Sequence, residues 1–521
     1  MRRWRPIRNL GLAGLLVATL WLLPFPIRCL EPSPYSNAQD AEQGASEKPY
    51  PFDGRNMFFG LSVINLRKHA AFVEDLGISW LSLQPHVLWM TVERTPAVYD
   101  WSELDEEVRA LQALGLDATM VLSPLINAFG EERQEVIDAI AQYPSFLHFM
   151  RQGVGPEYQL YPQAETLPLW RDFLRAAVDR YDGDGVNDMP GLRFQVRNWH
   201  VVEEYPTPSL PDERVYVDLL GQAYEIIKDE DPDARVILAG IAGNFAHWFA
   251  FMGGFIDDPA AGVVGGELMT REEMNASSFW SFRKRCYEWM VENAFDSFDV
   301  MDLHAYIPIE SFLEGEIAYL NDLMSRFGEP KPIWIIEGGG PHKNFPGYPA
   351  INSPADDYFG WGTFAENAEF VVKLHAMSAA AGVERQHWGI GGYKGENAYW
   401  DGPWCGMGLL DWYDSHRKPS YYTFKLLIEK LDGFTGCIDV SFDDVRAFRF
   451  SMDGEPIFVL WNQCEAETPV DASPILGDAN VLVTRIVTAL DEASAPIQYL
   501  PEIVSSTVLP VSITPIFVEP H

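Results

Sequence analysis

From residue 57 onward, short apolar runs rich in β-branched and aromatic residues alternate with longer segments of helical period. This alternation predicts repeated β-α units around a parallel sheet. Eight such runs are found, at residues 57–65, 78–84, 118–123, 198–204, 236–243, 300–307, 333–338 and 386–391. Eight strands with helices between them predict a closed (β/α)8 TIM barrel.

Amphipathic helices are expected between these strands. In the helix at residues 102–114, Ser102 is placed to cap the N-terminus and acidic residues occupy the first turn. Further helices are predicted at residues 212–228, 271–293 and 364–381. Because such barrels need roughly 250 residues and this span is longer, we expect extended loops, at residues 127–168 and 394–418.

The pattern changes after a helix predicted at residues 420–431. Short alternating strands follow, at residues 445–451, 456–461, 481–486 and 511–518. This pattern predicts a small all-β sandwich domain. We therefore divide the folded body into a barrel at residues 51–431 and a β-sandwich at residues 432–521.

The N-terminal segment differs from the rest of the chain. Several arginines precede an apolar run at residues 10–27. A basic segment followed by an apolar one is the secretory pattern, and the run is also near the length of a membrane span. Residues 1–30 are therefore predicted to be a signal peptide or a membrane anchor, and the polar residues 31–50 a linker. We expect a secreted or cell-envelope protein that meets a membrane only through such an anchor.

Composition narrows the function classes. The 521 residues are 47% hydrophobic, which is enough for a large core. The net charge of -37 repels phosphate backbones, so nucleic acid is not expected as a partner. Cys437 and Cys464 lie in the same C-terminal segment and could form a disulfide. No spacing suggests a zinc site.

Two glutamates end predicted strands. Glu204 ends the fourth strand, after Trp199 and Val201, and Glu337 ends the seventh, after Trp334 and Ile335. Active sites of such barrels lie at the C-terminal ends of the strands. Both strands resemble those of the retaining glycoside hydrolases of clan A. The resemblance implies that Glu204 is the acid/base, that Glu337 is the nucleophile, and that no cofactor is needed.

The resemblance extends over nearly the whole chain. It includes the sixth-strand segment at residues 298–306, Trp388 on the eighth strand and the closing β-domain, which ends at residues 516–519. It implies a carbohydrate substrate, an oligo- or polysaccharide. The residues leave α- and β-linkages open, and the resemblance favours β-linkages. No single family within the clan is fixed.

Two carboxyl groups suit this chemistry. Cleaving a glycosidic bond requires a proton for the leaving oxygen and negative charge at the anomeric carbon. A separation of roughly 5 to 5.5 Å allows direct attack, which retains the configuration. Mutual repulsion between the two groups should raise the pKa of the acid.

Further residues are candidates for substrate binding. His304 and Tyr306 alternate on one strand, so both face the same side and could hold the carboxylate of the nucleophile or bind a hydroxyl. Trp388 is expected to be a platform for a sugar face, and Trp400 in the long eighth loop could extend it.

Two positions depart from the pattern of the clan. Glu203 stands where relatives have an Asn that donates to the sugar 2-hydroxyl, and Ser82 stands where an Arg is usual. Loss of that Arg should raise the pKa of Glu337 unless another cation, Lys394 or His304, replaces it. The alternative function is therefore a catalytically impaired barrel that acts as a glycan-binding or envelope-associated protein.

A short acidic segment resembles a calcium loop. Asp182, Asp184 and Asp188 are spaced as oxygen ligands, but no glutamate closes the loop. The alternative is a turn whose Asp side chains bind their own backbone. No metal is predicted.

Overall fold

The computed structural model describes residues 50–62, 66–82, 85–124, 161–162, 164–205, 213–241, 245–264, 267–306, 310–339, 363–389, 408–410 and 416–521. The predicted signal or anchor at residues 1–30 lies outside the described residues, as do Trp400, Lys394 and all of the predicted linker except Tyr50. Within the described part of the chain, no helix is both long and apolar enough to cross a membrane.

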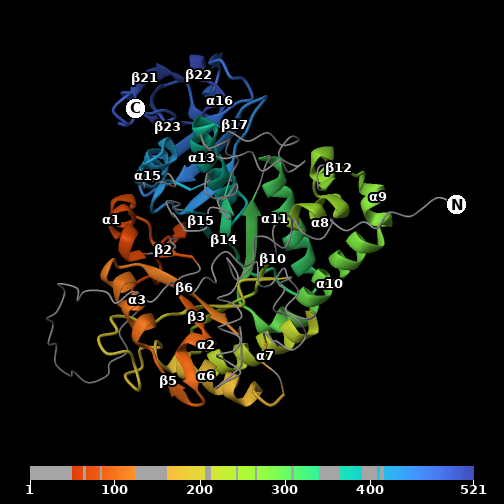
Figure 1. Ribbon diagram of the computed structural model, residues 1–521. Coiled ribbons are helices and arrows are strands. Elements are labelled where there is room, and N and C mark those ends of the chain that lie inside the picture. The colour runs from red at the N-terminus through yellow and green to blue at the C-terminus, as the bar shows by residue number, and fades with distance from the viewer. Residues whose placement is uncertain are drawn as a thin grey trace.

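Eight parallel strands form the barrel (Figure 1). They are β1 (Phe59–Ser62), β2 (Trp80–Leu81), β6 (Asp117–Ser123), β7 (Asn198–Val201), β9 (Arg235–Ile237), β13 (Met301–Tyr306), β14 (Ile333–Gly339) and β15 (Arg385–Gly389). Their order is β13-β14-β15-β1-β2-β6-β7-β9. A parallel bridge between Ile237 and Val300 joins the two ends of this order. The predicted (β/α)8 barrel is confirmed, and each strand overlaps a predicted run.

Helices surround the barrel. The longer ones are α1 (Leu66–Leu76), α3 (Ser102–Ala113), α6 (Leu167–Asp179), α7 (Glu213–Glu230), α8 (Phe245–Gly253), α10 (Ser278–Ala294), α11 (Ser311–Ser325), α13 (Phe364–Ala380) and α15 (Pro419–Leu431). The helix predicted at residues 271–293 is divided into α9 (Arg271–Ala276) and α10, because the side chain of Ser277 accepts a hydrogen bond from Trp280 N and caps a new helix. Ser102 does not cap α3: it is the first helical residue, and its Oγ donates to Asp100 Oδ1 at 2.6 Å.

A cluster of polar residues, joined by hydrogen bonds and an ion pair, lies at the N-terminal end of the barrel strands. Asp117 begins β6 and lies 2.9 Å from Arg385 Nη1, and its Oδ2 accepts a hydrogen bond of 2.9 Å from Asn198 Nδ2. Tyr50 OH donates to the same carboxylate. Because every partner comes from a different segment, these contacts tie the segment before β1 to the barrel.

The C-terminal domain is a β-sandwich, as predicted. One sheet has the order β16-β17-β18-β23-β20-β21, and its strands are β16 (Gly436–Asp439), β17 (Arg446–Ser451), β18 (Ile457–Trp461), β23 (Ile516–Pro520), β20 (Asn480–Arg485) and β21 (Glu502–Ser505). The second sheet pairs β19 (Thr468–Val470) with β22 (Leu509–Val511). The strand predicted at residues 511–518 is therefore wrong as one element, because β22 and β23 belong to different sheets.

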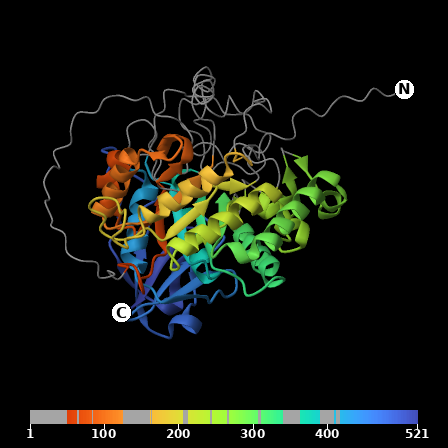
Figure 2. The same cartoon turned by 90° about the horizontal axis from the view of Figure 1, so that it is seen from below.

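The sandwich packs against one side of the barrel, next to α13 and α15 (Figure 1, Figure 2). Phe448 and Trp461 belong to the same hydrophobic cluster as the barrel residues. Trp461 Nε1 also donates to Glu310 Oε2 at 3.2 Å, and Lys373 on α13 lies 2.7 Å from the same carboxylate. Burial of these aromatic rings holds the two domains together.

The sequence left open a disulfide between Cys437 and Cys464, and in the structure both cysteines are free. Cys437 lies on β16 with its Sγ 4.0 Å from Ala376 O on α13. Cys464 lies in the loop after β18, and β17 separates that strand from β16. Cys437 therefore faces the barrel and not the other cysteine.

Candidate active site

A backbone distortion precedes the two consecutive glutamates. Val202, between β7 and β8 (Glu204–Tyr205), has a φ of 64°, which is a rare conformation for a β-branched residue. In a regular strand Glu203 and Glu204 would face opposite sides. Here both are buried, with exposed fractions of 7% and 1%. The distortion therefore lets both carboxyl groups enter one cluster.

His304 lies at the centre of this cluster. Its Nδ1 is 3.1 Å from Glu204 Oε1 and 3.5 Å from Glu337 Oε2. The pairing of β13 with β14 places His304 directly opposite Glu337. Glu204 on β8 and Glu337 on β14 therefore both lie close to the same nitrogen atom, His304 Nδ1.

Asp302 holds the other side of the His304 ring. Its Oδ2 lies 3.0 Å from His304 Nε2, and its Oδ1 accepts a hydrogen bond of 3.2 Å from Ile336 N. When the three carboxyl groups are ionised, acceptors face both nitrogens of His304, and each nitrogen then carries a proton. Burial alone would lower the pKa of His304, but Glu337 and Asp302 raise it well above its usual value. These contacts and the raised pKa both favour the charged form of the buried His304 ring.

A second histidine completes this network. His200 on β7 lies with its Nε2 3.4 Å from Asp302 Oδ2 and 3.1 Å from Leu238 O. Both neighbours are acceptors, so Nε2 carries the proton. Burial lowers the pKa of His200 to about 4, which keeps this ring neutral at neutral pH.

Glu337 is buried, and its contacts with His304 and Tyr306 both favour its ionised form. Burial raises its pKa to about 7, the His304 cation works in the opposite direction, and the carboxylate of Glu204 adds to the rise. Tyr306 OH donates to Glu337 Oε1, so the contact predicted between Tyr306 and a site carboxylate is present. The pKa of Glu203 is raised well above its usual value by burial, with Glu337 and Glu204 adding to the effect.

Ser82, which the sequence analysis compared with an arginine of clan A, contacts a histidine side chain. Ser82 Oγ lies 3.0 Å from His387 Nδ1, and His387 Nε2 lies 3.1 Å from Gly338 O. Burial lowers the pKa of His387 to about 3, so this ring is neutral. Among the described residues, the cation that contacts Glu337 is therefore His304.

The structure does not bring Trp388 into this cluster. Trp388 is fully buried, and its ring centroid lies 6.1 Å from that of His375 on α13. Its neighbour His387 contacts Ser82 and Gly338, and successive side chains of a strand face opposite sides. Trp388 therefore packs toward the helix layer instead of forming the expected sugar platform. Trp400, its predicted extension, lies outside the described residues.

Gly240 is a further residue of the site that the sequence analysis did not single out. It begins β10 (Gly240–Ile241), which pairs with β8 beside Glu204. A Cβ atom at this position would overlap the ring of His304 and lie 2.6 Å from Asp302 Oδ2. Only glycine lets β10 approach so closely. Asp302 was also missed, although it lies two residues before His304 and so shares its face.

We expect Gly240→Ala to destabilise the protein by about 1 to 3 kcal/mol, because the methyl group overpacks a buried polar network. Gly221→Ala is the matched control. Gly221 lies inside α7, and a Cβ there meets only Ser297 Oγ at 3.8 Å, so alanine should stabilise that helix by about 0.5 to 1 kcal/mol. Urea unfolding of the two variants measures both effects, and an equal response of the two would contradict the tight packing.

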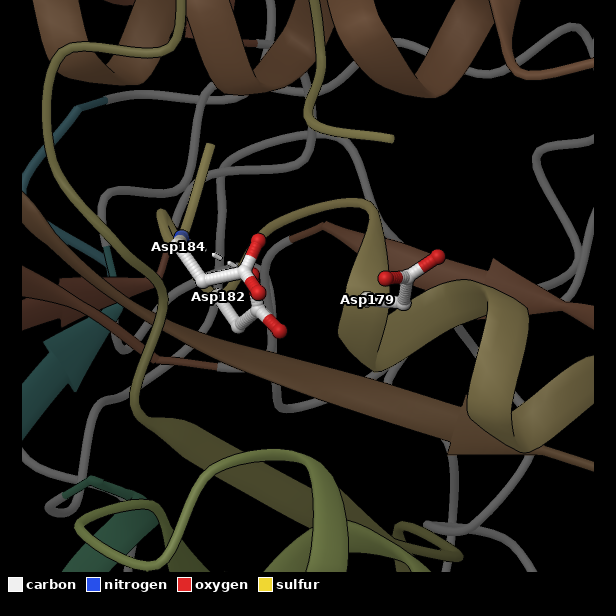
Figure 3. Close-up of side chains that lie close together, drawn as sticks. All are labelled: Asp179, Asp182 and Asp184. Atoms are coloured by element: carbon white, nitrogen blue, oxygen red, sulfur yellow. Dashed lines mark hydrogen bonds between the residues drawn. The ribbon is translucent and has the colours of Figure 1, made fainter. Parts of the chain in front are cut away.

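Asp179, the last residue of α6, forms an acidic cluster with Asp182 and Asp184 (Figure 3). One carboxylate oxygen of each lies within 4.8 Å of the others. Asp182 Oδ1 accepts a hydrogen bond of 3.1 Å from Asp184 N, and Asp188 accepts bonds from Gly183 N and Gly185 N. These side chains bind their own backbone, which is the turn that the sequence analysis gave as the alternative to a calcium loop.

Comparison with solved structures finds the same fold in glycoside hydrolases. A family 39 glycoside hydrolase from the gut symbiont Bacteroides cellulosilyticus WH2 matches with a TM-score of 0.53 and 14% identity, over 92% of this chain and 83% of that chain. A monomeric beta-xylosidase from Caulobacter crescentus CB15 matches with a TM-score of 0.50 and 16% identity, over 89% and 96%. No family model and no curated protein matches the sequence. The likeness establishes the fold that the resemblance to clan A predicted.

Proposed function

We propose that this protein is a retaining glycoside hydrolase, with Glu204 as the general acid/base and Glu337 as the nucleophile. The convergence of both carboxyl groups on His304 Nδ1 supports this proposal most directly. Because the two oxygens share one nitrogen, their separation is less than the sum of 3.1 Å and 3.5 Å. This bound is compatible with the roughly 5 to 5.5 Å of retaining enzymes.

In the first step, Glu337 attacks the anomeric carbon while Glu204 gives its proton to the leaving oxygen, and a covalent glycosyl-enzyme forms. In the second step, Glu204 takes a proton from water, and the water oxygen displaces Glu337. The His304 cation and the Tyr306 hydroxyl favour the ionised form of Glu337. Asp302 favours the charged form of His304, and His304 supplies the positive charge in place of the missing arginine.

The substrate class follows from the fold and the site together. Glycosidases share the barrel, and one of them is named as a beta-xylosidase. We therefore propose an O-linked oligo- or polysaccharide with β-linkages as the substrate. The basic and apolar segment at residues 1–30 supports action outside the cytoplasm, with the protein secreted or held at the cell envelope.

Activated 2-deoxy-2-fluoro glycosides test the mechanism, since they form the glycosyl-enzyme faster than it breaks down. We expect the intact mass of the full chain to rise by one glycosyl group with the matching sugar. Peptide mapping should place that group on the peptide that contains Glu337. An adduct on another residue would refute this assignment of the nucleophile.

The alternative function is a glycan-binding or envelope-associated barrel without efficient turnover. Ser82 favours it, because its contact with a neutral His387 leaves the usual position of the arginine without charge. In this case none of the activated 2-deoxy-2-fluoro glycosides would form an adduct, although the folded protein would still bind glycans.

A further inference from the structure

Glu203 is a third glutamate of the site, and its carboxyl group is buried without a donor. Its exposed fraction is 7%, and Oε1 has no hydrogen-bond partner among the described residues. Its position is fixed by the main chain, since Gly240 N donates to Glu203 O at 3.1 Å. A buried carboxylate oxygen that accepts no hydrogen bond is much less stable than the neutral acid.

The surroundings of Glu203 are rich in negative charge. The titratable groups that face it are Glu204 on β8, Glu337 on β14, and Asp302, His304 and Tyr306 on β13. Of these described groups, His304 is the cation, and its two nitrogens already face Asp302 on one side and Glu204 on the other. Burial and the carboxyl groups of Glu337 and Glu204 therefore raise the pKa of Glu203 by more than the His304 charge lowers it.

We propose that Glu203 is a specificity-determining residue that keeps its proton at neutral pH and donates it in a hydrogen bond to a sugar hydroxyl next to the reacting carbon. This inference rests on the proposed function of the same site. A neutral carboxylic acid carries an O–H donor, whereas a carboxylate only accepts. Protonated Glu203 thus supplies the donor that the clan obtains from asparagine, and burial, which raises its pKa, favours this form.

The protonation state is tested without any substrate, by urea unfolding of the full chain as a function of pH. Above about pH 4.5 the unfolded chain has released the proton that folded Glu203 keeps, so this group makes the wild type less stable as pH rises. Glu203→Gln cannot titrate. We expect the ratio of the wild-type to the variant unfolding constant to rise by up to tenfold per pH unit, and to continue rising above pH 7.

Glu203→Met gives the same test if the glutamine variant does not fold, because methionine is of similar length and also cannot titrate. Parallel stability curves of the wild type and a folded variant between pH 5 and pH 8 would overturn the inference. That outcome would leave the proposed function intact, since glycosyl-enzyme formation is measured separately.

The donor role is tested with the glycoside that carries a hydroxyl group where the labelling sugar carries fluorine. Glutamine keeps an N–H donor, so we expect Glu203→Gln to retain kcat/KM within about tenfold, and Glu203→Met to lose more than about tenfold. With the substrate that lacks the hydroxyl next to the anomeric carbon, the two variants should be equal. A preference of the wild type for an amino group at that carbon would indicate an ionised Glu203 and overturn the inference.

Discussion

Replacing Glu337 by glutamine is expected to abolish glycosyl-enzyme formation and to lower turnover by about 10⁴-fold or more. Glutamine has nearly the shape of glutamate and can still accept the hydrogen bond from Tyr306 OH, but its amide cannot form the glycosyl ester. Intact mass after incubation with the labelling sugar measures the first effect, and release of the leaving group measures the second.

Glu316→Gln is the matched control for this experiment. Glu316 lies on α11, is 2% exposed and belongs to a different part of the molecule, where its nearest ionisable neighbour is His247 at 3.8 Å. Labelling should be unchanged in this variant. If Glu337→Gln were labelled as fast as the wild type, the nucleophile would have to be another residue.

The Glu337→Gln variant should be more stable than the wild type at high pH. Burial raises the pKa of folded Glu337 to about 7, whereas the unfolded group titrates near 4.5. The wild type therefore loses stability between these two pH values, and the variant does not. We expect a gain of about 2 to 3 kcal/mol above pH 7 and none at pH 4. A stable but inactive variant would show that the site reduces the stability of the fold.

Much of the fold was predictable from local sequence. The eight runs that became barrel strands are apolar, short and separated by segments of helical period, and each of these features is local. Glu204 and Glu337 were found in the same way, because each ends such a run. The errors lie where local pattern leaves alternatives, as at Ser277, which divides one apolar helix pattern into two helices.

The rest of the site depends on long-range pairing. Asp302 and Gly240 become important only once β10, β13 and β14 are neighbours, and no local pattern fixes that arrangement. Trp388 was assigned to the wrong face because the direction of a side chain depends on where the strand begins. The charged form of His304 is favoured by the carboxyl groups of Glu337, Asp302 and Glu204, which sequence spacing does not place around this ring.

Replacing Glu204 by alanine is expected to separate the two steps of the reaction. A poor leaving group needs a proton from Glu204, so kcat/KM for such glycosides should fall by about 10² to 10⁴-fold. A good leaving group departs without that proton, and the glycosyl-enzyme should form nearly as fast as in the wild type. Its breakdown should be slow, because water then has no base, and the covalent intermediate should accumulate.

Restored turnover in the presence of azide distinguishes loss of the base from general damage to the site. Azide is a nucleophile that needs no base, and alanine leaves space for it where the Glu204 carboxyl group stood. We expect azide to restore turnover of Glu204→Ala and to give a glycosyl azide of retained configuration, since two successive displacements each invert the carbon. Azide should not rescue Glu337→Gln, which forms no intermediate. If Glu204→Ala slowed good and poor leaving groups equally and azide had no effect, Glu204 would not be the acid/base, and Glu203 would be the next residue to test.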